Sequence, residues 1–154
     1  MVPTLSEVLA RAIEKEIGSQ MLYQSLSQRV SQQATRDVFL ELVQQERGHQ
    51  HLLEQYQRGE LKRGALSPDH LVDYRIAEKL DSPRISPDME LRDAFLVAAN
   101  REKISHELYL GLAQTHPGGE VKKLFKQLAA QELEHKHKVE LLYTEVAFPQ
   151  TDGG

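Results

Sequence analysis

The chain has 154 residues, enough for one domain and too few for two ordinary ones. Hydrophobic residues make up 40% and charged residues 27%, with a net charge of −4, which excludes a disordered chain and gives no basic footprint for nucleic acid. No apolar run approaches the roughly 20 residues that a membrane-spanning helix needs. The first residues also lack the basic start and apolar run of a signal peptide, so we expect a cytoplasmic protein with no membrane partner.

Cysteine is absent, and this limits the chemistry. It excludes disulfides, thiolate catalysis, cysteine-bound zinc and iron–sulfur clusters within this chain. A bound metal ion must therefore be held by carboxylate and imidazole groups, which suit iron, manganese or zinc.

Four long helices are predicted from the spacing of apolar residues and from the scarcity of proline. The second is expected to stop at Gly59, and the third follows Ser86-Pro87-Asp88, a serine cap with proline in the first helical position. The sequence His116-Pro117-Gly118-Gly119 separates the third helix from the fourth. The expected helices span about residues 4–31, 34–57, 88–114 and 120–146.

The connections between these helices are short, long and short. The long one, about residues 59–87, has room for a short helix after Ser67-Pro68-Asp69. This pattern is typical of two antiparallel helix hairpins joined by one crossover. We therefore predict an all-α four-helix bundle that forms a single domain over residues 1–154.

The two predicted hairpins repeat each other. Shifting the chain by 86 residues aligns residues 9–54 with 95–140 without a gap, and 14 of these 46 positions are identical. A shared amphipathic pattern would match apolar residues with apolar ones, but here specific polar residues match as well. We interpret this as a duplication of one hairpin.

The matched polar residues lie on the stripes that face the core. In each half, a glutamate interrupts the apolar stripe of the first helix, and Glu-x-x-His follows thirty residues later on the stripe of the second helix. Residues three apart share a helix face, so each Glu-x-x-His directs both side chains to one place. The candidate metal ligands are Glu16, Glu46, His49, Glu102, Glu132 and His135.

Neighbouring charges do not belong to this set. A third Glu-x-x-His, at Glu134 and His137, lies two residues or about 200° out of register, so we expect it on the solvated surface. Arg47 and Arg101 flank the stripes and are not expected to neutralise the glutamates.

Four carboxylates packed together without counter-charge would be very unfavourable, since each buried charge costs several kcal/mol. Two divalent metal ions would supply +4 against the −4 of the four glutamates. Neutral His49 and His135 would each add a nitrogen ligand. The residues therefore predict a dinuclear metal centre at the middle of the bundle.

The sequence resembles the rubrerythrins of the ferritin-like superfamily over about residues 5–145. The similar phrases are Ala12-Ile13-Glu14-Lys15-Glu16, leading to Leu22-Tyr23, and the segment from Leu124 to His135. The resemblance implies a ferritin-like bundle with two iron ions, for which zinc or manganese could substitute. It also implies that Glu46 and Glu132 bridge the metals, that Glu16 and Glu102 bind terminally, and that each histidine binds one metal. Tyr23 and Tyr109 would hydrogen bond to the ligands.

Two departures from rubrerythrins are visible. The chain has no cysteine for a rubredoxin domain, so we expect electrons from a separate protein such as a rubredoxin. Ser105 stands where rubrerythrins carry a further glutamate, and His106, one residue later, is a candidate extra ligand.

The resemblance implies an oxidoreductase that reduces hydrogen peroxide or dioxygen in defence against oxidative stress. Two alternatives remain: a ferroxidase that handles iron, and a metal-binding bundle without turnover. We expect a homodimer by resemblance, and the long crossover could let hairpins exchange between protomers.

Overall fold

The computed structural model describes residues 5–59, 90–115 and 119–147. The predicted helix ends lie within three residues of the observed ones. The short helix expected in the crossover and the Ser86-Pro87 cap lie outside the described residues. The four helices are α1 (Leu5–Arg29), α2 (Gln33–Gln57), α3 (Leu91–Thr115) and α4 (Glu120–Ala147).

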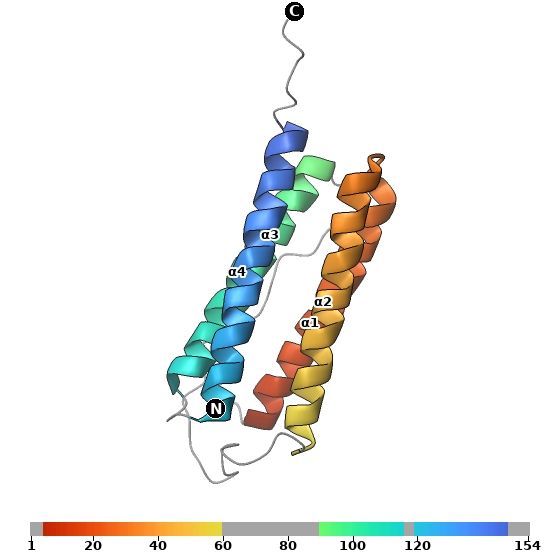
Figure 1. Cartoon of the computed structure of the whole chain (residues 1–154). Coiled ribbons are helices and arrows are strands. Elements are labelled where there is room, and N and C mark those ends of the chain that lie inside the picture. The colour runs from red at the N-terminus through yellow and green to blue at the C-terminus, as the bar shows by residue number, and fades with distance from the viewer. Residues whose placement is uncertain (1–4, 60–89, 116–118, 148–154) are drawn as a thin grey trace, which may run out of the picture.

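The helices form two antiparallel hairpins that stand side by side (Figure 1). α1 packs mainly on α2 and α3 mainly on α4, whereas contacts between the hairpins are sparser. The predicted all-α bundle of two hairpins is therefore confirmed. No helix within the described ranges has an apolar stretch that could cross a bilayer.

Local signals end the helices of the first hairpin. The Arg36 guanidinium donates to the carbonyl oxygens of Ser27 and Val30, each at 3.2 Å, and so satisfies acceptors left at the end of α1. α2 ends before Gly59, whose φ of +72° is the left-handed conformation that glycine adopts most easily. The predicted stop at Gly59 is confirmed.

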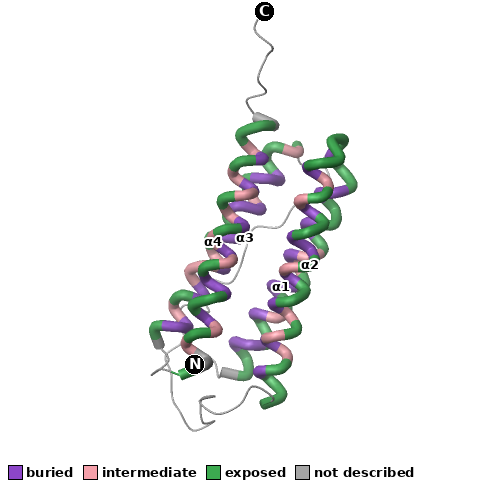
Figure 2. Tube along the Cα trace, viewed as in Figure 1, coloured by how far each residue is buried: buried purple, intermediate pink, exposed green. Residues whose placement is uncertain are grey.

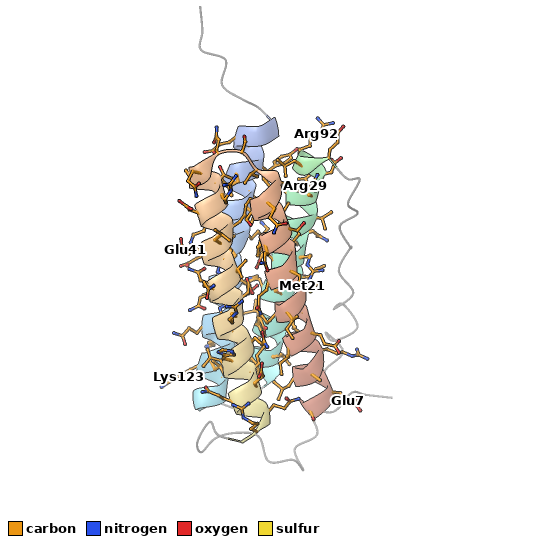
Figure 3. All side chains as sticks on the ribbon, turned by 90° about the vertical axis from the view of Figure 1, so that its right-hand side faces the viewer. Glu7, Met21, Arg29, Glu41, Arg92 and Lys123 are labelled. Atoms are coloured by element: carbon orange, nitrogen blue, oxygen red, sulfur yellow. The ribbon has the colours of Figure 1, made fainter. Side chains whose placement is uncertain are left out.

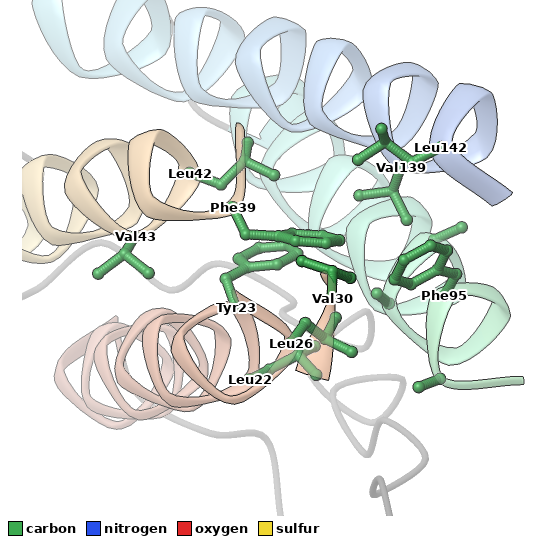
Figure 4. Packing of buried hydrophobic residues seen from close by; sticks show 13 residues of the cluster. Leu22, Tyr23, Leu26, Val30, Phe39, Leu42, Val43, Phe95, Val139 and Leu142 are labelled. Atoms are coloured by element: carbon green, nitrogen blue, oxygen red, sulfur yellow. The ribbon is translucent and has the colours of Figure 1, made fainter. Parts of the chain in front are cut away.

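Buried residues line the sides of the hairpins that face each other (Figure 2). They form two apolar clusters. One is built around Tyr109 and Phe125, whose rings stack with centroids 6.3 Å apart. In the other, Tyr23 stacks on Phe39 at 5.9 Å, and Phe39 contacts Phe95 at 5.3 Å (Figure 4). The buried polar residues of the bundle lie on the same helix stripes as these two clusters.

Candidate metal centre

The six predicted ligands come from all four helices. α1 and α3 contribute one glutamate each, and α2 and α4 each contribute a glutamate and a histidine one helical turn apart. All six are buried, with at most 3% of any of them exposed. The structure thus brings together side chains that are up to 119 residues apart, from Glu16 to His135.

Their ligand atoms form two overlapping groups. Within each group, one atom per residue can be chosen so that all of these atoms lie within 4.8 Å of one another. Two glutamates, Glu46 and Glu132, belong to both groups, as expected of carboxylates that could bridge two ions. The groups are Glu16, Glu46, His49 and Glu132, and Glu46, Glu102, Glu132 and His135.

Several inward atoms of these residues have no hydrogen-bond donor. They include Oε2 of Glu16, Glu46 and Glu102 and both carboxylate oxygens of Glu132. His49 Nδ1 lies 2.7 Å from Glu132 Oε1 but outside hydrogen-bond geometry. Buried polar atoms are normally satisfied, so this convergence of unpaired acceptors fits metal ions as their partners.

Two glutamines orient the histidines, and the sequence analysis assigned them no role. Gln131 Oε1 lies 2.5 Å from His49 Nε2, and Gln45 Oε1 lies 2.6 Å from His135 Nε2. An amide oxygen only accepts, so each Nε2 donates its hydrogen and each Nδ1 is directed toward the carboxylates. In the sequence, the two glutamines stand out only because Gln45 and Gln131 are identical at equivalent positions of the repeat.

The two tyrosines support the glutamates in a crossed arrangement. Tyr23 on α1 donates to Glu102 on α3, and Tyr109 on α3 donates to Glu16 on α1. The predicted tyrosine–glutamate hydrogen bonds are therefore present, with each tyrosine serving the opposite hairpin. Since both tyrosines and both glutamates are buried, these bonds fix one oxygen of each carboxylate.

Crowding of the carboxyl groups changes their proton affinity. Burial raises the pKa of Glu132 to about 8, and repulsion by Glu46 and Glu16 adds to the effect. Burial and neighbouring carboxylates also raise the pKa values of Glu46 and Glu102. For Glu16, burial acts in the same direction but is outweighed by close polar contacts with Glu46 and His49, so the pKa of Glu16 is lowered.

The histidines respond in opposite directions. Burial opposes a proton on His49, but contacts with Glu132 and Glu16 outweigh it and raise the pKa of His49 strongly. Burial, followed by the positive charge on His49, lowers the pKa of His135 to about 3. Bound protons thus hold the negative charges together, and metal binding must displace them.

Residues near the centre correct part of the expectation. His106 belongs to neither ligand group: its Nδ1 hydrogen bonds to the Ala129 carbonyl oxygen at 2.7 Å, which joins α3 to α4. Arg101 is not simply on an outer flank, because its Nε is buried. A Cβ atom at Gly18 of α1 would lie only 2.9 Å from its guanidinium. Lys15, the repeat equivalent of Arg101, is also buried, and burial followed by the charge of Arg101 lowers its pKa to about 8.

The out-of-register residues lie where the sequence predicts. Glu134 and His137 are both exposed, as is Arg47. The Glu-x-x-His motif alone therefore does not identify a buried ligand. The motif must also lie on the helix stripe that faces the core.

The fold has counterparts among solved structures. A hypothetical protein from Pyrococcus furiosus superposes with a TM-score of 0.75 at 22% identity, covering 98% of this chain and 99% of that one. A protein from Thermotoga maritima, described as ferritin-like and diiron-carboxylate, superposes with a TM-score of 0.72 at 25% identity, covering 95% and 98%.

The fold is ferritin-like. Residues 7–74 match the family model described as Rubrerythrin, which confirms the resemblance over the first hairpin. No curated protein matches the chain significantly. The ferritin-like bundle therefore resembles rubrerythrins over residues 7–74 and contains two buried groups of carboxylate and imidazole side chains suited to metal ions.

Proposed function

We propose that this ferritin-like protein holds two iron ions in the buried centre and reduces hydrogen peroxide or dioxygen with electrons from an external protein. The observation that carries the proposal is the pair of overlapping ligand groups that share Glu46 and Glu132. The Thermotoga maritima protein described as diiron-carboxylate supports iron as the metal. When bound, two ferrous ions would supply the two electrons that, with two protons from solvent, reduce one hydrogen peroxide to two water molecules.

In this proposal the side chains of the protein bind the metal ions, orient the ligands and keep water away from the centre. The four glutamates neutralise the two divalent charges, and the two histidines contribute Nδ1 as ligands. Gln45 and Gln131 hold the rings so that Nδ1 faces inward. Tyr23 and Tyr109 fix the carboxylates of the opposite hairpin, and the apolar clusters limit access of water.

Anaerobic loading with Fe(II), followed by substoichiometric peroxide, tests the proposal. We expect binding of two Fe(II) per chain and rapid oxidation, seen as the near-ultraviolet absorption of a ferric pair. Slow oxidation by dioxygen with release of Fe(III) would favour a ferroxidase. Zinc that stays bound and inert under iron challenge would favour a binding protein without turnover.

A pair of variants checks the register of the ligands. Glu132→Ala should lower metal occupancy far more than Glu134→Ala, because Glu132 is in both ligand groups and Glu134 is exposed. Metal analysis after gel filtration measures this. Equal losses in the two variants would contradict the assignment of the buried stripe as the metal site.

A further inference from the structure

A cavity that is open to solvent lies between α2 and α4 and is lined in part by the two histidines. Its volume is about 310 Å³. Six water molecules occupy about 180 Å³ at their liquid share of about 30 Å³ each, so a hydrated metal ion fits. The lining residues are Gln45, Gly48, His49, Leu52, Gln131, Glu134 and His135.

Two of the six candidate ligands, His49 and His135, line this cavity. The His49 and His135 rings lie nearly parallel, 5.7 Å apart, with their Nε2 atoms bonded to the glutamines that also line the cavity. Both rings belong to the ligand groups that contain Glu132, whose two carboxylate oxygens have no hydrogen-bond partner. Rotation of one imidazole toward the cavity would therefore open the centre.

The two halves of the repeat contribute different residues to the cavity at one pair of equivalent positions. Gly48 is equivalent to Glu134, and both are exposed at the cavity. A Cβ at Gly48 would meet nothing within 4 Å, so packing does not require glycine there. Glycine weakens a helix interior, and its presence in α2 keeps space open beside His49.

Charge distinguishes this face from the opposite side of the bundle. The cavity lining includes one carboxylate, Glu134, and no lysine or arginine. On the α1/α3 side, the equivalent positions Lys15 and Arg101 place cationic side chains beside the centre. The cavity lining therefore favours an approaching cation more than the α1/α3 side does, although Lys138 on α4 is near enough to help lower the pKa of His135.

We infer that the α2/α4 cavity is the entrance by which divalent metal ions reach the centre, that Gly48 keeps it open and that Glu134 attracts the ion at its mouth. This inference rests on the proposed function, because it needs a metal centre to fill. It adds the route and the two residues that control the rate of loading.

The absence of cysteine allows the entrance to be blocked after folding. Gly48→Cys gives a single thiol, which a bulky maleimide can modify on the folded protein. Met21→Cys is the matched control, since Met21 is 67% exposed on the outer surface of α1 (Figure 3). The probe is Co²⁺, followed by its absorption on binding in stopped flow and by equilibrium titration.

We expect the modified Gly48→Cys protein to bind two Co²⁺ at equilibrium but to load slower by about tenfold or more, while the modified Met21→Cys protein loads at the original rate. Glu134→Gln should slow loading several-fold and reduce its salt dependence, with Glu140→Gln as control. Normal equilibrium binding with an unchanged loading rate in both modified Gly48→Cys and Glu134→Gln would overturn the entrance alone. Failure of the unmodified wild-type chain to bind two ions would overturn the proposed function, and the entrance with it.

Discussion

At the scale of single residues, the centre depends on which face of a helix a side chain occupies. Glu132 is fully buried and Glu134 exposed, although both begin a Glu-x-x-His motif. The repeat and the stripe together identified the six ligand candidates from sequence. The roles of Gln45 and Gln131 could not be predicted, because they depend on α2 facing α4 so that each amide reaches the histidine of the other helix.

The Gln131 amide should matter for metal affinity without being a ligand. Gln131→Ala removes the acceptor for His49 Nε2 and frees the ring to rotate or change tautomer. We expect metal affinity to fall by about 10–100-fold, the usual effect of losing such a partner. Gln131→Glu should restore affinity because it keeps an acceptor, and Gln127→Ala, exposed one turn earlier on α4, is the control. Competition titration measures all four proteins, and a loss no greater than that of Gln127→Ala would contradict the role.

At the scale of helices, the amphipathic patterns were sufficient to predict the elements and their pairing into hairpins. The contacts between hairpins were not predictable in the same detail. Each tyrosine lies two turns from the glutamate of its own helix, but its partner is the glutamate of the other hairpin. That choice depends on the separation and offset of α1 and α3, which apolar spacing alone does not specify.

The crossed tyrosine bonds should stabilise the association of the hairpins. Tyr23→Phe removes the donor to Glu102 and leaves a buried carboxyl oxygen without a partner. We expect the free energy of unfolding to fall by about 1–3 kcal/mol, with a similar loss for Tyr109→Phe. Chemical denaturation of the chelated protein measures the effect. Tyr143→Phe, which alters a partly buried tyrosine outside the ligand set, should cost less; equal costs would argue against a special contribution of the crossed bonds.

At the scale of the whole molecule, the buried acids make stability depend on pH. Burial raises the folded-state pKa of Glu132 from 4.5 to about 8, so folding favours its protonated form, and this stabilisation is lost as pH rises through about 8. Glu46, Glu102 and His49, whose pKa values are also raised, act in the same direction. His135, lowered from 6.5 to about 3, acts oppositely but only below about pH 6.5.

Between pH 6.5 and 8 the metal-free protein should therefore lose stability as pH rises. Over the same range, metal binding should strengthen, because fewer protons must be displaced. Thermal unfolding in the presence of a chelator, compared with unfolding after metal loading, checks both trends. If the melting temperature of the metal-free protein rises between pH 6.5 and 8, the idea that bound protons stabilise the buried carboxyl groups would be wrong.

The reciprocal exchange between Tyr23 and Glu102 and between Tyr109 and Glu16 has a consequence for symmetry. Two identical hairpins related by a twofold axis would form the same pair of hydrogen bonds, because each contact across such an interface occurs twice. Neither hairpin alone can supply a tyrosine for its own glutamate across this interface. Loss of a tyrosine in one hairpin therefore removes a hydrogen bond from the glutamate of the other hairpin. A change in either copy of the repeat thus affects the ligands of both.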